Sequence, residues 1–366
     1  MHVALTPLAD RIRAAAAAVA PLRIRGGGSK DFYGQALTGD VLDTRALCGI
    51  TSYEPSELVV TALAGTPLAQ LEQLLASQAQ FLPFEPPYFG AAATVGGMVA
   101  AGLSGPARAS SGAVRDYVLG VQMFSGQAQL LRFGGQVIKN VAGYDVSRLM
   151  AGSMGTLGLI TEVSLKVLPR PVAEATVRME TDQADALRRL SGWAARPLPL
   201  NASAWQRIDG RGLLHVRLRG AQAAVRAGCH AIGGERMDDQ KAHAFWHSLR
   251  EQSAGFFNRT DDTCLWRLSV PDAAGVMPLA ADEALLEWGG AVRWVHACAA
   301  QAPELRAAAQ SLGGNATLFR RAADGTPADT PVFQPLAPAL LRIHRALKQQ
   351  FDPAGIFGPG RMFATL

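Results

Sequence analysis

Two glycine-rich segments carry most of the information in this chain: Arg25-Gly26-Gly27-Gly28-Ser29-Lys30 and Thr94-Val95-Gly96-Gly97-Met98-Val99-Ala100-Ala101-Gly102. Each follows residues whose pattern indicates extended structure. Glycine has no Cβ and tolerates positive φ, so backbone N–H groups in such segments can turn inward and approach an anion closely. Arg25 and Lys30 add positive charge. Together the segments predict a diphosphate site, although either one alone is equally compatible with an ordinary tight turn.

Neither segment matches the two commonest nucleotide-binding fingerprints. The chain has no G-x-x-x-x-G-K-[ST], and no G-x-G-x-x-G stands between a strand and a helix. A flavin dinucleotide held by loops fits the two segments better than either of these phosphate-binding motifs does.

Composition describes a well-buried globular protein. The chain has 366 residues, of which 49% are hydrophobic and 18% charged, so we expect two domains, or two lobes and a cap. The formal net charge is +5, and the basic residues are scattered, which argues against nucleic-acid binding. A small positive excess suits an anionic cofactor and a small carboxylate substrate.

The sequence predicts a cytoplasmic protein, with at most a peripheral association with the inner face of the plasma membrane. No run reaches the roughly 18 apolar residues needed to cross a bilayer. The alanine run at 14–20 fits an amphipathic helix over 6–20, capped by Thr6, better than a signal peptide. The four cysteines form no C-x-x-C pair, so we expect no zinc or iron–sulfur cluster in this chain.

Periodicity predicts an α+β fold in which antiparallel sheets dominate. The expected domains are 1–171, with lobes of about 1–80 and 81–171, then a cap of strands and helices over 172–321, and a closing segment over 322–366 that returns to the first domain. Further helices are expected at 67–78 and 340–350. The expected strands are 22–25, 41–43, 49–51, 58–62, 118–124, 129–133, 159–168, 213–218 and 263–270.

Five segments, in this order, resemble the FAD-binding domain of the vanillyl-alcohol oxidase and p-cresol methylhydroxylase superfamily. The ending around Phe351–Arg361 resembles the closing segment of that family, and within the superfamily the chain looks like the FAD-binding subunits of bacterial glycolate oxidases. The five segments are Arg25–Lys30, Thr94–Gly102, Gly112–Gly120, Lys139–Asp145 and Gly152–Glu162.

The resemblance implies a bipartite FAD-binding domain with a small antiparallel cap. It implies FAD in an extended form with its pyrophosphate on the two glycine segments. Relatives that tether FAD covalently often have histidine in the first glycine loop; the matching position here is Ser29, so a non-covalent flavin is expected. The implied cofactor-binding residues are Arg25, Gly26, Gly27, Gly28, Ser29, Lys30, Thr94, Val95, Gly96, Gly97, Gly102, Gly155, Leu157, Gly158 and Ile160. No catalytic residue or metal ligand is assigned.

The implied function is oxidation of glycolate, a 2-hydroxy acid, within a complex of several subunits. Relatives that oxidise 2-hydroxy acids resemble one another in a paired-histidine motif and an acidic-His-Gly segment, and this chain has neither; 311–320 stands where the second is expected. The resemblance therefore implies a second flavin subunit that holds the substrate. An iron–sulfur subunit would carry the electrons away.

Several residues remain open to two interpretations. His243 and His247 stand four apart, as metal ligands on a helix do, but no third ligand is evident and a solvent-facing pair explains them better. Lys139 and Tyr144 could face the flavin or shape a turn. His215 and His296 fit packing roles, and Arg115-Asp116 an ion pair. Two rival functions also stay open: an assembly subunit without turnover, and a free-standing oxidoreductase for another alcohol or sugar.

Overall fold

The computed structural model describes residues 3–135, 145–258, 263–277, 283–323, 326–327 and 330–366. The chain divides into two compact units. Unit 1 comprises 1–104, 113–170 and 335–366, and unit 2 comprises 105–112 and 171–334. Antiparallel sheets dominate both units, which confirms the predicted α+β class.

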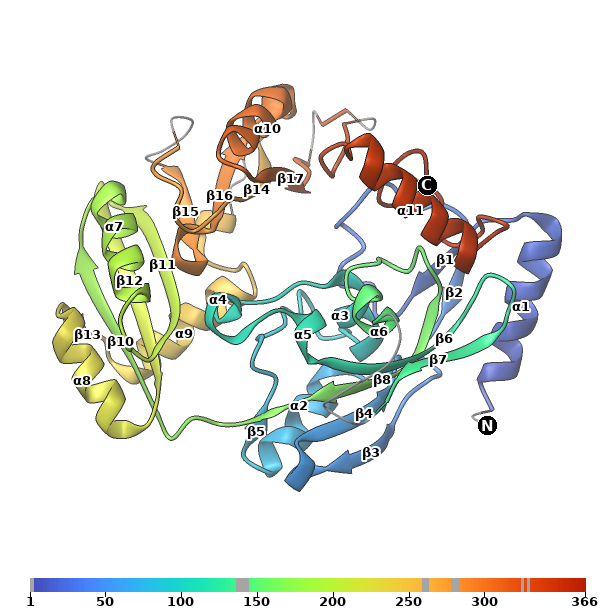
Figure 1. Ribbon diagram of the computed structural model, residues 1–366, viewed down its shortest axis with the longest axis horizontal. Helices are drawn as coiled ribbons and strands as arrows, with labels where there is room; N and C mark the ends of the chain where they lie inside the picture. Colours follow the sequence, from blue (N-terminus) through green and yellow to red (C-terminus); the bar gives the residue numbers. More distant parts are fainter. Residues whose placement is uncertain (1–2, 136–144, 259–262, 278–282, 324–325, 328–329) are drawn as a thin grey trace. The chain divides into compact units, whose positions relative to one another are not determined.

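Unit 1 is built on a five-stranded antiparallel sheet (Figure 1). Its order is β3-β4-β8-β6-β7, so the central strand β8 comes from a part of the sequence well after β4. A parallel pair, β1 and β2, and a short pair, β5 and β9, complete the strands. The bounds are β1 Leu22–Arg25, β2 Asp40–Asp43, β3 Ile50–Glu54, β4 Val59–Leu63, β5 Gln80–Phe81, β6 Val118–Phe124, β7 Leu130–Gly134, β8 Leu159–Lys166 and β9 Leu168–Pro169.

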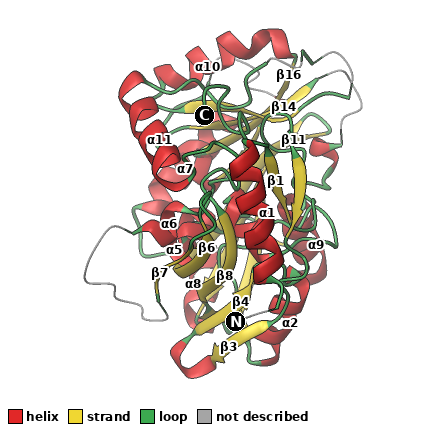
Figure 2. Ribbon diagram, turned by 90° about the vertical axis from the view of Figure 1, so that its right-hand side faces the viewer, coloured by secondary structure: helices red, strands yellow, loops and turns green. Residues whose placement is uncertain are grey.

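The helices of unit 1 pack their apolar sides on these strands. Helix α1 buries Leu5, Leu8 and Ile12, spaced three and four apart, in one cluster with residues of β1 and β2 and the ends of β6 and β8. Figure 2 shows α1 beside β1. Each buried leucine or isoleucine stabilises the fold by about 1.5–3 kcal/mol. The bounds are α1 Leu5–Ala18, α2 Leu68–Ser77, α3 Val95–Ala101, α5 Val114–Tyr117, α6 Val146–Leu149 and α11 Pro338–Phe351, with a 3₁₀ turn η1 at Pro55–Glu57.

Two predicted details of unit 1 are wrong. Helix α1 begins at Leu5 with Ala4 as its N-cap, so Thr6 lies inside the first turn and caps nothing. The second glycine segment was expected as a loop, but Val95–Ala101 forms α3. Thr94 supplies the N-cap that the sequence interpretation overlooked, because its side chain accepts a hydrogen bond from the backbone N–H of Gly97.

Unit 2 is an eight-stranded antiparallel sheet in the order β13-β10-β12-β11-β15-β16-β14-β17. The strands are β10 Ala173–Glu180, β11 Leu200–Ile208, β12 Arg211–Gly220, β13 Glu235–Arg236, β14 Cys264–Ser269, β15 Leu285–Glu287, β16 Val292–Ala297 and β17 Asn315–Arg320. The helices are α4 Arg108–Ser111, α7 Gln183–Ala194, α8 Gln222–Ile232, α9 Asp239–Arg250 and α10 Ala302–Ser311, with 3₁₀ turns η2 Gly255–Phe257, η4 Trp288–Gly290 and η5 Ala299–Gln301.

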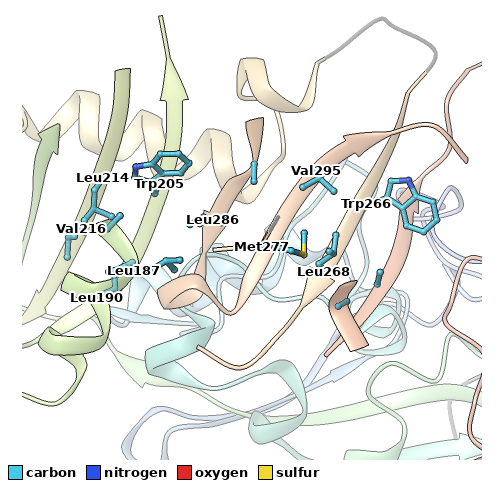
Figure 3. Close-up of a cluster of buried hydrophobic side chains, with 14 of the residues drawn as sticks. Leu187, Leu190, Trp205, Leu214, Val216, Trp266, Leu268, Met277, Leu286 and Val295 are labelled. Carbon is cyan, nitrogen blue, oxygen red and sulfur yellow. The ribbon is translucent and has the colours of Figure 1, made fainter. Parts of the chain in front are cut away.

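The core of unit 2 lies between the sheet and helices such as α7. Leu187 and Leu190 of α7 belong to the same cluster as Trp205 of β11, and Trp266 and Val295 extend it along the sheet (Figure 3). These side chains are at least 93% buried. All six tryptophans of the chain lie in unit 2, which makes their fluorescence a probe of this unit alone.

The longest described helices, α1 and α11, have 14 residues each. None of the helices in the described part of the chain is long and apolar enough to cross a membrane. The predicted domain boundary at 171/172 lies next to the unit boundary at 170/171, and 335–366 belongs to unit 1. The functional division into domains stays a prediction.

Candidate functional site

The two glycine-rich segments lie against each other in unit 1. A Cβ added at Gly26 would lie 2.3 Å from Thr94 Oγ1, and one added at Gly27 would lie 1.5 Å from the carbonyl oxygen of Ala92. Both distances are far too short for a side chain. Glycine is therefore required at both positions for the segments to meet, and their meeting is what a shared diphosphate site needs.

A pocket of about 110 Å³ opens where the segments meet. Sites that enclose a drug-sized molecule have about 300–1,000 Å³, so this pocket has room for part of a dinucleotide. Its lining residues come from four parts of unit 1: Arg23, Ile24, Arg25, Gly26, Gly27, Gly28, Ser29, Lys30, Asp31, Tyr33, Ala36, Leu37 and Thr38; Thr94, Gly97, Ala100 and Ala101; Met154 and Gly155; Gly358 and Arg361.

The first glycine segment offers backbone donors to this pocket. The N–H groups of Gly27, Gly28 and Ser29 have no hydrogen-bond partner among the described residues. Gly28 has φ +75°, a conformation that favours glycine, and it turns the chain directly after β1. Successive unpaired N–H groups in such a turn form an anion-binding concavity. The predicted donor nest is thus present in this segment.

The second segment lines the pocket with Thr94, Gly97, Ala100 and Ala101, but its first N–H groups are already hydrogen-bonded within unit 1. Val95 N–H donates to Thr66 O at 2.9 Å, and Gly96 N–H donates to Ala64 O at 2.7 Å. Gly97 N–H donates to the capping hydroxyl of Thr94 at 3.2 Å. The first N–H groups of a helix have no acceptor within the helix, and here Thr66, Ala64 and the Thr94 hydroxyl supply the acceptors. The expectation that both segments present free N–H groups therefore holds only for the first.

Four cationic side chains line the pocket: Arg23, Arg25, Lys30 and Arg361. Arg25 Nε donates to Asp31 Oδ2 at 2.7 Å, which holds its guanidinium across the first segment. Lys30 Nζ donates to the backbone oxygen of Tyr88 at 3.1 Å. The Nε atom of Arg23 is buried and has no hydrogen-bond partner in the described structure.

Arg361 joins the end of the chain to the first glycine segment. It is 6% exposed, and its guanidinium donates to the backbone oxygens of Asp31, Tyr33 and Gln35. Burial lowers the pKa of Arg361, and the negative charge of Asp31 opposes this shift. Arg361 thus stabilises the conformation of the loop at 31–35, which follows the first glycine segment.

The closing segment reaches the pocket by pairing with β1. Leu22 N–H donates to Ile356 O at 2.7 Å, and Gly358 N–H donates to Leu22 O at 2.9 Å. Gly358 has φ +49° and lines the pocket. The loop at 152–155 is held in a similar way, because Met154 N–H donates to Ala100 O at 2.8 Å.

The structure brings nine of the fifteen predicted cofactor residues to this pocket: Arg25 to Lys30, Thr94, Gly97 and Gly155. The other six do not line it. Gly96 packs on Ala64, Gly102 on Gly152, and Gly158 on Met123 and Phe124; Leu157 lines a second cavity, and Val95 and Ile160 are buried in the core. Their role in cofactor binding stays a prediction. Residues 139–144 lie outside the described residues.

Sequence reasoning missed several lining residues. Arg23 could have been found, because it stands two positions before Arg25 on a strand and so lies on the same face. Met154 and Arg361 lie in two segments that carry the family resemblance, 152–162 and 351–361, but neither residue was assigned to the cofactor site. They reach the site through contacts between parts of the chain that are far apart in sequence.

The candidate histidines of unit 2 are either exposed to solvent or packed against other groups of the protein. His243 and His247 are exposed on α9 with their rings stacked 6.4 Å apart. His215 is 4% exposed and stacks on Phe245 at 4.1 Å. His296 Nε2 contacts Phe256 O at 2.8 Å. Among the described residues no group of three or more histidine, cysteine or acidic side chains could hold a metal ion.

In unit 1, Arg115 and Asp116 form a long, exposed ion pair of 3.9 Å. Asp116 also accepts a hydrogen bond from the N–H of Ala113 at 2.8 Å, so it stabilises the start of α5.

The pocket fits the diphosphate part of FAD. It combines unpaired backbone donors, an unpartnered Arg23 Nε and three further cations, which is the donor set that a doubly charged anion requires. A model of the FAD binding domain family matches residues 6–134, which include both glycine segments. The fold and the site thus define an FAD-dependent oxidoreductase, and its cofactor is FAD.

The comparisons with known proteins narrow this class. The chain is 45% identical to the glycolate oxidase subunit GlcE of Escherichia coli over 98% of this chain and 97% of that protein. The chain belongs to the GlcE family. It is also 31% identical to the glycolate oxidase subunit GlcD of Bacillus subtilis, over 45% of this chain and 36% of that one.

A solved structure supports the fold. p-Cresol methylhydroxylase with substrate bound is 16% identical, with a TM-score of 0.75 over 98% of this chain and 88% of that one. This similarity confirms the predicted p-cresol methylhydroxylase type of fold.

Proposed function

We propose that this protein is the FAD-binding subunit of a multi-subunit glycolate oxidase that oxidises glycolate to glyoxylate. The identity to a relative named as a glycolate oxidase subunit, along nearly the whole length of both proteins, supports this function. The observation that carries it is the convergence of the unpaired N–H groups at 27–29 with four cationic side chains in one pocket.

The residues of this chain bind and orient the cofactor. The N–H groups of Gly27, Gly28 and Ser29 would hold diphosphate oxygens, and Arg23 and Lys30 would neutralise their charge. Bound FAD supplies the acceptor for the hydride that leaves the α-carbon of a 2-hydroxy acid. Ser29 carries no imidazole for a covalent tether, which supports non-covalent binding.

The proposal includes two partner subunits. An iron–sulfur subunit would accept the electrons, since the sequence of this chain has no cysteine pair spaced for a cluster. A second flavin subunit would hold the substrate carboxylate. The relative named GlcD, which resembles only part of this chain, supports a second subunit of related fold.

The experiment is purification of a tagged chain from its native cell under gentle conditions, followed by visible spectroscopy and quantitative mass spectrometry. We expect a yellow complex of three different subunits whose flavin band bleaches on addition of glycolate. We also expect the flavin of this chain to leave on acid precipitation. Recovery of a colourless single chain would contradict the proposal. A flavin that remains on the precipitated polypeptide would contradict the non-covalent binding of FAD.

The rival function, an assembly subunit without turnover of its own, is favoured by the absence of the family's paired-histidine and acidic-His-Gly motifs from the sequence. The two functions differ in one measurement. If the flavin of this chain stays oxidised within a complex that turns over glycolate, the assembly role is correct.

A further inference from the structure

Unit 1 contains a second cavity, of about 230 Å³, between α11 and the segment 149–157, which begins at the last residue of α6. Its lining is mainly apolar. Apolar cavities of about 150 Å³ can accommodate benzene, so this cavity is large enough for an aromatic ring. It is lined by Leu149, Ala151, Gly152, Ser153, Thr156, Leu157, His344, Leu347, Lys348, Met362 and Leu366.

One polar group in the wall of this cavity lacks a partner. Ser153 is 5% exposed, and its hydroxyl oxygen is buried without a hydrogen-bond partner. Lys348, by contrast, donates from Nζ to Thr156 O, Phe357 O and Asp352 Oδ2 at 2.7–2.8 Å. A buried hydroxyl without a partner destabilises a fold, so this one favours an occupant with a polar tip.

Large apolar side chains are exposed at the rim of the cavity. Leu149, which also lines it, is 36% exposed. Leu340 and Ile343 of α11 are 50% and 56% exposed, and each stands one helical turn before a lining residue, His344 or Leu347. The apolar surface therefore continues from the cavity onto the helix, as it does at binding sites.

The charge of α11 is of one sign. Residues 338–351 include Arg342, Arg345 and Lys348 and no acidic residue. Lys348 is engaged in the interior of unit 1, and Arg342 lies on the face of α11 opposite the lining residues. The exposed cation next to the cavity is therefore Arg345, which stands one turn before Lys348. A complementary surface would carry carboxylates next to its apolar centre.

We propose that this surface, defined as the cavity together with Leu149, Leu340, Ile343 and Arg345, docks a segment of a partner subunit. The segment inserts a tyrosine or tryptophan side chain into the cavity and places acidic residues beside α11. Aromatic anchors with a polar tip in such pockets dominate binding at protein interfaces. A concave site fits a protein side chain better than a bilayer. The inference deepens the proposed function, because it rests on the existence of partner subunits.

The test compares two matched leucines in complexes purified from the native cell. Leu149→Glu introduces a charge at the rim, and Leu130→Glu introduces the same charge on β7 at a leucine that is 38% exposed. We expect Leu149→Glu and Ile343→Glu to lower the amount of partner subunit recovered per chain about 10-fold or more, with FAD content unchanged. Leu130→Glu is expected to assemble like the wild type.

A photo-crosslinking residue in place of Ile343 identifies the occupant. We expect a crosslink to a partner peptide that contains tyrosine or tryptophan flanked by aspartate or glutamate. Equal assembly of Leu149→Glu and Leu130→Glu, with FAD content unchanged in both, would overturn the inference and leave the proposed function intact. If Leu149→Glu loses FAD as well, Leu149→Trp, which fills the rim without a charge, decides by the same comparison.

Two further outcomes would overturn the inference. A wild-type chain recovered without any partner would remove the proposed complex too. Binding of the purified chain to anionic but not to neutral phosphatidylcholine vesicles, abolished by Ile343→Glu, would assign the surface to a membrane instead.

Discussion

The glycines of the candidate site differ in what a side chain would do at each position. At Gly26 and Gly27 an added Cβ would collide with Thr94 and Ala92, so substitutions there disrupt the contact between the two segments. At Gly97 an added Cβ meets only Thr94 Oγ1, at 3.0 Å, and the residue lines the pocket. Gly97 is therefore the position at which the binding of the cofactor can be tested with the least disturbance of the fold.

We expect Gly97→Val to lose most of its FAD, because the branched side chain occupies space at the pocket that the diphosphate approaches. The control is Gly192→Val, in helix α7, where an added Cβ has no neighbour within 4 Å. Flavin absorbance per chain, together with the melting temperature of the apoprotein, separates loss of binding from unfolding. Full flavin content in Gly97→Val would show that the pyrophosphate lies elsewhere.

His215 predicts a pH dependence of stability in unit 2. Burial, aided by the charge of Arg178, lowers the pKa of His215 from 6.5 to about 4. The folded state therefore binds a proton less readily than the unfolded state does. Stability is fully present above about pH 6.5 and is lost as the pH falls toward 4, by up to about 3 kcal/mol.

We expect His215→Leu to remove this part of the pH dependence. Urea unfolding at pH 7 and pH 4.5, followed by tryptophan fluorescence, measures it in unit 2 alone. His230→Gln, at an exposed position of α8, is the control and should retain the wild-type pH dependence. An unchanged pH dependence in His215→Leu would mean that folding does not lower the pKa of this histidine.

At the level of secondary-structure elements, the buried ion pair of Lys348 and Asp352 joins helix α11 to two segments that line the pocket. Lys348 Nζ binds Thr156 O, which follows the pocket residue Gly155, and Phe357 O, which precedes Gly358. Its partner Asp352 is 1% exposed. The Asp352 carboxylate also accepts from the N–H groups of Ile356 and Phe357. The pair thus positions two pocket-lining segments without lining the pocket itself.

We expect Lys348→Met to destabilise unit 1 by about 3 kcal/mol or more, because it leaves a buried carboxylate without its cation. The double variant with Asp352→Asn should recover part of the stability, because no buried charge is left unpaired. Its affinity for FAD should remain weakened, because the carbonyl oxygens of Thr156 and Phe357 still lack the hydrogen bonds from Lys348. Circular dichroism melting and FAD titration measure the two effects. Arg345→Met, on the same helix but exposed, serves as control for both; FAD affinity at the wild-type level in the double variant would contradict the positioning role.

For the whole molecule, the prediction concerns dependence on partners. We expect the isolated chain to be reduced by glycolate far more slowly than the complex. A group that fixes the carboxylate and one that takes the hydroxyl proton would both be missing, and general-base catalysis alone contributes about 10²- to 10⁴-fold. Stopped-flow measurement of flavin bleaching in the two preparations provides the comparison. Bleaching at equal rates would show that this chain carries a complete active site.

Local patterns predicted elements well where one face of a strand or helix is buried. The strand at 118–124 was predicted with its observed bounds, and the helix expected at 340–350 is α11 at Pro338–Phe351. The helix after Thr94 was missed because glycines at 96 and 97 disfavour helix in isolation. Here Gly96 is required by the approach of Ala64, a contact that no local pattern reveals.

The α+β class, the FAD cofactor through a family resemblance, and the cationic, glycine-rich first segment could all be predicted from the amino-acid sequence. The reason is that periodicity, turn chemistry and motif order are local properties of the chain. The set of groups that share the pocket depends instead on contacts between segments that are far apart in the chain. Arg361 contacts Asp31 across 330 positions, and the first N–H groups of the second segment donate to Thr66, Ala64 and Thr94. Such contacts depend on how β1 pairs with the closing segment, and no local pattern encodes that pairing.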